Sequence, residues 1–327
     1  MKKTLAGLAA ALSLGLCAGA PASAAAPAGA PALPQNITMV VPFPPGGSND
    51  VFARVLAEKL SDRLSVPVIV ENRPGAGGAI GAEYVSRAAR DGSVLMLSSS
   101  TLTTNAAVQT NLKYDVVRSF APVAMLARSP MALVVGKDSP YRSVADLLAA
   151  GRKDPGKLTY GSAGVGSVNQ MASEILAGGA QTSFTHVPYK GMSPALNDLA
   201  GGRVDFVIGS FASVASLLKG GRLRVLAVTS PGRSQFYPDL PAIGESVPGY
   251  SVELWWGVLA PQGAPAPLVE RLNQEIRAIV TDDKMRAMFA EESAVPATLT
   301  VPQFADLVRA DAGKWKQVAE ERHISAQ

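Results

Sequence analysis

The feature that most constrains the fold of this chain is a regular alternation of short apolar runs with segments of helical periodicity. The first apolar run lies at 37–41, and a helical pattern follows at 49–64 after a Pro-Pro-Gly-Gly turn. Apolar runs at 66–70 and 94–97 flank a second helical pattern at 79–89. Because parallel strands are connected by crossover helices, this order predicts an α/β fold with parallel strands.

A second alternation of the same kind begins after residue 130. Strands are predicted at 131–135, 157–160, 186–188, 204–208 and 225–229, and helices at 144–150, 168–177 and 193–199. The chain then continues in amphipathic helical segments without further strands, at 267–280, 283–291 and 302–322. The second alternation therefore predicts a second lobe.

The simplest arrangement of these parts returns the chain across a hinge near 251–256 and packs the last helices on the first lobe. We therefore predict a two-lobed α/β clamshell with two interlobe crossovers. Lobe 1 comprises 35–129 and 254–327, and lobe 2 comprises 130–253. Ligands of open α/β sheets bind beyond the carboxyl ends of the strands, which is where the Gly- and Ser-rich loops of this sequence lie.

The N-terminal residues predict export. An apolar run at 5–16 follows two lysines and precedes a small-residue cleavage site. We expect a signal peptide at 1–24, a low-complexity lead at 25–34, and a soluble mature protein in the periplasm. Cys17 is the only cysteine and lies within the signal, where lipidation is the alternative to simple cleavage. Without another cysteine, the mature chain has neither disulfides nor thiolate chemistry.

Composition argues against several classes of function. The formal charge of +4 includes two lysines of the predicted signal, and there is no basic block, so nucleic acid is not an expected partner. The only histidines are His186 and His323, and no Gly-x-Ser-x-Gly motif is present. A serine hydrolase using Ser48 or Ser167 is a minor alternative because it lacks an evident base. No cluster has metal-ligand spacing, and we expect neither a metal nor another cofactor.

Three strand-to-helix turns have the composition of anion-binding loops. In the first, Gly46 and Gly47 allow backbone N–H groups to approach a ligand, and Ser48 is the predicted N-cap of the following helix. Asp50 is predicted to stabilise the positive end of the dipole of that helix. An ordinary tight turn is the alternative interpretation.

The second turn, at 160–170, contains three glycines and two serines, and the third, at 187–196, contains Tyr189 and Lys190. The spacing of these glycines does not match a nucleotide-binding motif. If this turn does not bind a ligand, Tyr189 is a core residue and Lys190 is an ordinary surface lysine. The hydroxyl residues at 98–101 are either a solvated turn or a row of donors that faces the second lobe.

Seven motifs along the chain resemble, in order, those of the Bug family, the TctC-type periplasmic solute receptors of tripartite tricarboxylate transporters. They are PFPPGGSND, ENRPGAGGAIGAEYVSRAARDG, FAPVAMLA, YGSAGVGS, HVPYKGMSPALNDLAGGRVDF, LRVLAVTS and WWGVLAPQGAPAPLVERLN. The resemblance covers nearly all of the mature chain. It implies a two-lobed periplasmic binding protein fold of type II-like form, which holds small carboxylates between the lobes through backbone N–H groups, hydroxyls and ordered water.

Carried over position by position, the resemblance implies a set of ligand-binding residues on both lobes. These are Phe43, Gly47, Ser48, Asn49, Ser99, Ser100 and Thr101 on the first lobe, and Ser162, Ala163, Gly166, Ser167, Tyr189, Lys190 and Ser210 on the second. The chain departs from the family at Asn49, where Thr is frequent, at Gln170, where His is frequent, and at 209–210, where an Asp-Asn pair is frequent. The missing Asp favours a ligand without an amino group, such as a dicarboxylate or an aromatic acid.

The expected function is therefore that of an extracytoplasmic solute receptor without catalytic activity. Its expected partners are a small carboxylate and, transiently, the membrane permease subunits of a tripartite tricarboxylate-type transporter, with the receptor itself a monomer. A ligand sensor that signals to a membrane kinase is the alternative from another class. Closure of the lobes around the ligand is expected to exclude water and to strengthen the hydrogen bonds to its carboxylate.

Overall fold

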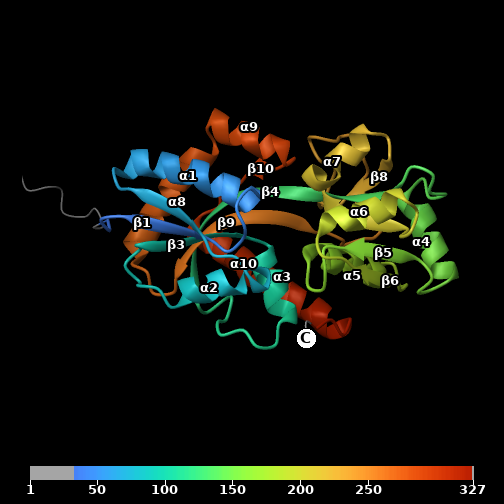
Figure 1. Ribbon diagram of the computed structural model, residues 1–327, viewed down its shortest axis with the longest axis horizontal. Helices are drawn as coiled ribbons and strands as arrows, with labels where there is room; N and C mark the ends of the chain where they lie inside the picture. Colours follow the sequence, from blue (N-terminus) through green and yellow to red (C-terminus); the bar gives the residue numbers. More distant parts are fainter. Residues whose placement is uncertain (1–32, 326–327) are drawn as a thin grey trace, which may run out of the picture. The chain divides into compact units, whose positions relative to one another are not determined.

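The alternation of apolar runs and helical patterns forms an α/β fold in the structure, a computed structural model that describes residues 33–325 (Figure 1). The predicted signal peptide, nearly all of the predicted lead and Cys17 lie outside the described residues. The first elements are β1 (Ile37–Val41), α1 (Ser48–Leu64), β2 (Val68–Asn72), η1 (Ala76–Gly78), α2 (Ala79–Ser86), β3 (Val94–Ser99) and α3 (Thr101–Val108). Strand β1 lies between β2 and β3 and is parallel to both, as the alternation predicts.

A second group of elements follows the long strand β4 (Phe120–Gly136). It consists of α4 (Val144–Lys153), β5 (Thr159–Ser162), α5 (Val168–Gly179), β6 (Thr185–Pro188), α6 (Met192–Ala200), β7 (Phe206–Ser210), α7 (Phe211–Lys219), β8 (Leu223–Val228) and η2 (Ile243–Glu245). Strand β5 pairs in parallel with both β6 and β7, whereas β4 is antiparallel to β7 and β8. This group thus repeats the parallel core of the first.

Two antiparallel strands connect the groups. In its first part β4 pairs with β9 (Glu253–Pro261), and from Met131 onward it pairs with β7 and β8. The sequence predicted only 131–135 of β4, because a proline removes a ladder hydrogen bond and argues against a strand. The structure accommodates Pro122 next to an irregularity in the pairing, and Pro130 where the strand changes partners.

The last elements are α8 (Ala266–Val280), α9 (Asp283–Glu291), β10 (Val295–Pro296) and α10 (Val301–Glu321). Helix α10 packs against both groups of strands. Phe304 and Val308 near its start lie in a buried cluster with Trp255 of β9, whereas Trp315 and Ala319 lie in the core of the second group. A packed helix therefore joins the two groups in addition to the two strands.

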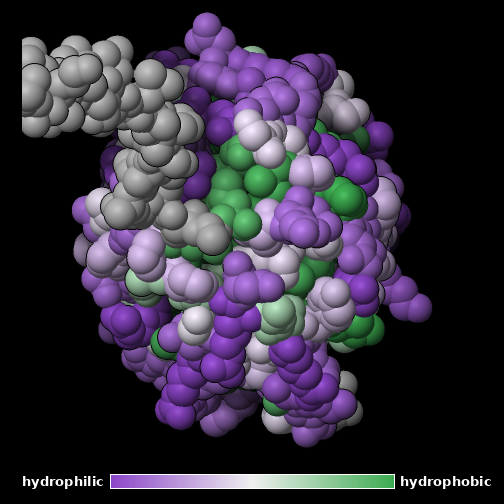
Figure 2. Space-filling model, turned by 90° about the vertical axis from the view of Figure 1, so that its left-hand side faces the viewer, coloured by the Kyte–Doolittle hydropathy of each residue, from purple (hydrophilic) through white to green (hydrophobic). Residues whose placement is uncertain are grey.

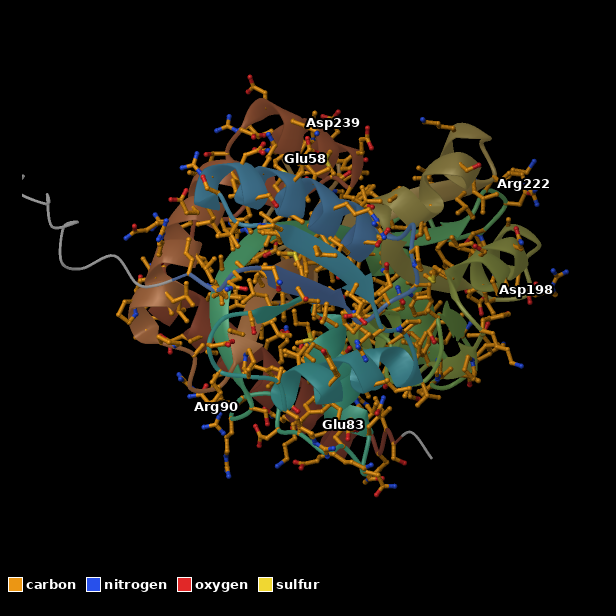
Figure 3. The ribbon with its side chains drawn as sticks, turned by 60° about the vertical axis from the view of Figure 1, so that its left-hand side comes forward. Glu58, Glu83, Arg90, Asp198, Arg222 and Asp239 are labelled. Atoms are coloured by element: carbon orange, nitrogen blue, oxygen red, sulfur yellow. The ribbon has the colours of Figure 1, made fainter. Side chains whose placement is uncertain are left out.

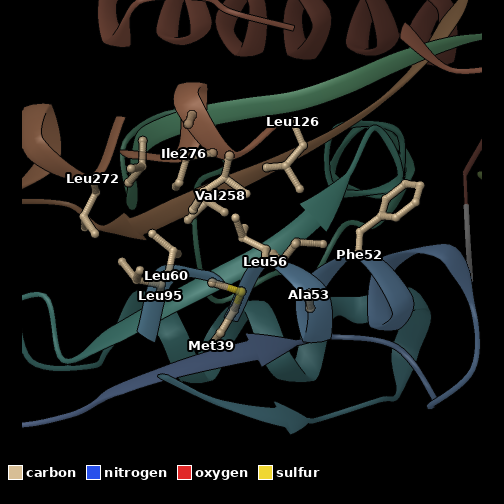
Figure 4. Packing of buried hydrophobic residues seen from close by; sticks show 14 of the residues in the cluster. Met39, Phe52, Ala53, Leu56, Leu60, Leu95, Leu126, Val258, Leu272 and Ile276 are labelled. Atoms are coloured by element: carbon tan, nitrogen blue, oxygen red, sulfur yellow. The ribbon is translucent and has the colours of Figure 1, made fainter. Parts of the chain in front are cut away.

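The main core of the first group holds α1 in place. Its buried face packs onto β1, β3, β9 and α8 through the residues labelled in Figure 4, among them Phe52, Leu56 and Leu60. The ring of Phe52 makes edge contacts with Trp256 of β9 and Phe289 of α9, at centroid distances of 5.2 and 5.1 Å. The N-terminal turn of α1 is thereby fixed beside a connecting strand and beside α9.

Charged side chains labelled in Figure 3 lie at the periphery, and the face shown in Figure 2 is mostly hydrophilic around a smaller apolar area near its centre. Within residues 33–325, no helix is sufficiently long and apolar to cross a membrane.

Candidate functional site

The helix that follows the first Gly-rich loop has a glycine, and not the predicted serine, at its N-cap position. Helix α1 begins at Ser48, and Gly47 occupies the N-cap position, where no side chain of the described residues makes a capping hydrogen bond. The prediction that Ser48 is the N-cap was therefore wrong by one residue. Gly46 adopts a φ of +92°, which a residue with a Cβ rarely adopts. The leading N–H groups of a helix without a side-chain cap are available to an anion.

Asp50 fixes the shape of this loop. Its buried carboxylate accepts hydrogen bonds from the backbone N–H of Gly46 at 2.9 Å, from the Arg54 guanidinium at 2.9 and 3.0 Å, and from the Asn72 amide at 2.8 Å. Asn72 also donates to the carbonyl of Phe43 at 3.1 Å. The hydrogen bonds from Arg54 hold the pKa of Asp50 down to about 2. Asp50 therefore organises the loop in addition to facing the helix dipole.

Of the hydroxyl residues at 98–101, Ser98, Ser99 and Ser100 are buried and Thr101 is partly buried, which excludes the interpretation as a solvated turn. Ser98 and Ser99 end β3, and Ser100 precedes α3, with its N–H donating to the carbonyl of Trp255 at 3.0 Å. The Ser99 hydroxyl donates to that of Thr101 at 3.3 Å. Buried polar groups nearly always have partners. The hydroxyls of Ser98 and Ser100 have none among residues 33–325.

The second loop is built around the buried hydroxyl of Ser162. This oxygen lies 2.6 Å from Nε2 of His186 and accepts a hydrogen bond from the N–H of Gly164 at 3.1 Å. The Ser167 hydroxyl donates to the carbonyl of Gly164 at 2.7 Å and caps α5 by accepting from the N–H of Gln170 at 3.4 Å. Ser162 thus shapes the loop from inside, with no exposed surface of its own.

His186 belongs to this inner layer. Burial lowers the pKa of His186 to about 4, so its imidazole is neutral at neutral pH. Its ring stacks on that of Tyr160, with centroids 4.9 Å apart. The contact with Ser162 gives a serine a neighbouring base, but the fully buried hydroxyl of Ser162 is closed to a substrate.

The third turn lies against the second loop through its backbone. The N–H of Tyr189 donates to the carbonyl of Ser162 at 3.1 Å, and the N–H of Gly191 donates to that of Ala163 at 3.3 Å. The Tyr189 hydroxyl instead donates to Asp198 at 2.7 Å. Asp198 lies at the periphery of the second group (Figure 3). Burial and this hydrogen bond raise the pKa of Tyr189 to about 12.

Two predicted residues lie beside these loops. Lys190 is exposed and has no hydrogen bond or ion pair within the described part of the chain. Ser210, at the end of β7, caps α7 by accepting from the N–H of Ser213 at 3.2 Å. The predicted positions therefore offer mainly backbone groups and one exposed cation, since most of their hydroxyls bond within the protein.

Asn105 of α3, which sequence reasoning missed, lies where loops of the two groups approach each other. Its amide nitrogen donates to the carbonyl of Gly77, and a Cβ added to Gly166 would lie 3.5 Å from its Oδ1. The same Cβ would lie 2.3 Å from Cγ2 of Val108, so α3 packs closely against the second loop. No sequence signal marked Asn105 as a site residue, because the helix that contains it was not predicted.

The arrangement offers mainly backbone N–H groups and the exposed cation of Lys190. Among residues 33–325, no group of three or more His, Cys, Asp or Glu side chains could hold a metal ion. The structure contains two groups of parallel strands, and two antiparallel strands connect them. In each group a Gly-rich loop precedes a helix. These features define the class of two-lobed periplasmic binding proteins.

The chain belongs to the tripartite tricarboxylate transporter receptor family, TctC, whose model matches residues 52–324. Protein BugT of Bordetella pertussis is 34% identical over 288 residues, which are 87% of this chain and 88% of BugT. These findings confirm the predicted family.

Solved structures agree with this assignment. An R. palustris protein solved with adipate has 35% identity and a TM-score of 0.76, and the match covers 89% of this chain and 98% of that one. MatC from Rhodopseudomonas palustris with bound malate has 29% identity and a TM-score of 0.72, over 86% and 98%. The structural matches confirm the predicted fold class.

Proposed function

We propose that this chain is an extracytoplasmic receptor that binds a small carboxylate between the loop at 43–49 and the loop at 162–167. The observation that carries the proposal is the uncapped N-terminus of α1 after Gly47, together with the close approach of α3 to Gly166 in the other loop. A helix N-terminus stabilises a carboxylate through its N–H groups and its dipole. The bound adipate and malate of two relatives are ligands of this chemical class.

The predicted site residues of the two loops and of the third turn have two kinds of role in this proposal. Backbone N–H groups of the residues at 47–49, together with those of Ala163 and Val165, bind the ligand, and Lys190 contributes positive charge. The N–H groups of Gly164, Gly166 and Ser167 donate within the protein and fix the shape of the second loop. Three further predicted residues, whose side chains bond within the protein, support the loops: Ser162, Tyr189 and Ser210. A ligand without an amino group fits best, because Gly209 and Ser210 provide no carboxylate to pair with one.

Function then follows from a change in population between open and closed forms. A ligand that contacts both loops favours the closed form, because only that form provides both sets of hydrogen bonds. We propose that the closed receptor, a monomer in the periplasm, is recognised by permease subunits in the membrane. Signalling to a membrane kinase is the alternative, and adjacent permease genes would argue against it.

Thermal unfolding against a panel of carboxylates tests this proposal. A compound that binds only the folded protein stabilises it by about 2.7 kcal/mol at a hundredfold excess over its Kd. We expect a saturable rise in Tm for C4 to C8 dicarboxylates or aromatic acids, and a smaller one for acidic amino acids. Lys190→Ala should weaken binding, whereas Lys219→Ala, an exposed lysine on α7, should not. Turnover of the bound acid would favour the hydrolase, and absence of any shift would contradict the proposal.

A further inference from the structure

The residue that follows α9 places a carboxylate of the protein itself at the start of α1. The hydroxyl of Ser48, the first residue of α1, donates a hydrogen bond to Oε1 of Glu292. Serine has one hydroxyl proton to donate. While Glu292 accepts it, Ser48 cannot donate to a carboxylate of a ligand.

The backbone around Glu292 is held from two sides. The Ser129 hydroxyl of β4 donates to the carbonyl of Glu292 at 2.8 Å. The next residue, Ser293, adopts a φ of +53°, and its hydroxyl lies 3.0 Å from that of Tyr237. Tyr237 in turn stacks on Phe211 at a centroid distance of 3.9 Å, at the start of α7. The segment at the end of α9 therefore contacts a connecting strand and the second group. The position of α9 in Figure 1 is consistent with these contacts.

These contacts direct the half-buried side chain of Glu292 toward the same helix terminus that a ligand carboxylate would occupy. A negative group is favourable at this position, and the N-terminus of α1 does not distinguish an internal carboxylate from a bound one. Two carboxylates at one hydroxyl, by contrast, repel each other. Binding of an anionic ligand therefore requires the Glu292 side chain to leave.

We infer that Glu292 is an internal competitor of the ligand carboxylate, an inference that rests on the proposed function. Glu292 sets the affinity of the site, because part of the binding free energy of every ligand carboxylate is used to displace the Glu292 side chain. Glu292→Gln keeps the size of the side chain and removes its charge, and Glu292→Ala removes the acceptor altogether. Both variants should bind carboxylates more tightly, by on the order of tenfold, the usual contribution of a hydrogen bond to a charged group.

Calorimetric titration of the purified receptor with adipate and with malate tests this inference. The matched control is Glu291→Gln, which removes the same charge from the exposed last residue of α9. We expect tighter binding by both Glu292 variants and an affinity within twofold of the original for the control. A purely structural role of Glu292 would weaken binding.

Unchanged or weaker binding by the Glu292 variants would overturn the inference while leaving the proposed function intact, provided that the unsubstituted receptor binds. An equal gain in the Glu291→Gln control would also overturn it, because the effect would then come from net charge. If neither the unsubstituted receptor nor any variant bound a carboxylate from the wider panel, the proposed function and this inference would fail together.

Discussion

Asp50→Asn removes the charge that organises the first loop, and its effect on stability can be worked out from the structure. The pKa of Asp50 falls from 3.8 to about 2, chiefly through the hydrogen bonds from Arg54. A depression of this size corresponds to about 2 kcal/mol of folding free energy. The Asp50 side chain is 5% exposed but that of Arg54 is 53% exposed. Solvent screening of the partner therefore reduces the expected contribution to roughly 1–2 kcal/mol.

The pH dependence of this contribution has a definite sign. Because the pKa of Asp50 is lower in the folded protein, the stabilisation is fully present above the unfolded pKa of about 4. It is lost as the pH falls toward 2, where Asp50 becomes protonated in the folded protein as well. The substitution should therefore cost roughly 1–2 kcal/mol at pH 7 and much less near pH 2.

Urea unfolding across this pH range measures the effect. The matched control is Asp62→Asn, which removes the same charge from an exposed position on α1 and should change stability by less than about 0.5 kcal/mol. The reasoning would be refuted if Asp50→Asn matched this control at pH 7, or if its deficit persisted unchanged near pH 2.

Two other substitutions test the packing around the loops. Gly166→Ala should lower Tm and weaken carboxylate binding, because Gly166 has a φ of +78° and an added Cβ would lie 2.3 Å from Val108. The control is Gly232→Ala, which should change neither Tm nor binding because open space surrounds Gly232. Asp311→Asn should cost about 1 kcal/mol in urea unfolding and shift tryptophan fluorescence, because Asp311 accepts hydrogen bonds from Thr103 and Trp255. Equal behaviour of each variant and the unsubstituted protein would contradict these expectations.

The regular elements could be predicted because periodicity is local. Strand β1 and helix α9 have the predicted bounds, α1 and α8 begin one residue earlier than predicted, and α10 begins and ends one residue earlier than predicted. Helices α3 and α7 were missed, as were strands β9 and β10, so the expectation of no further strands after 225–229 was wrong. The Thr-rich sequence of α3 has low helix propensity, and both helices begin directly after a strand without a turn signal, so tertiary packing determines them.

The candidate site could be predicted only at the level of its loops. Glycine and serine patterns located the turns, but the partners of their side chains come from distant parts of the chain. His186 lies 24 residues from Ser162, and Glu292 lies 244 residues from Ser48. No periodicity or spacing encodes such pairs. The ligand-binding roles themselves stay predictions.

A titration followed by NMR of the backbone amides tests the central claim most directly, because it observes the N–H groups that are proposed to bind the carboxylate. On addition of adipate or another carboxylate that raises Tm, we predict that the amide signals of residues 47–49 and 163–167 shift together, with one common saturation curve. Saturable shifts that spare either loop, or that concentrate elsewhere in the chain, would contradict a carboxylate site between the two loops.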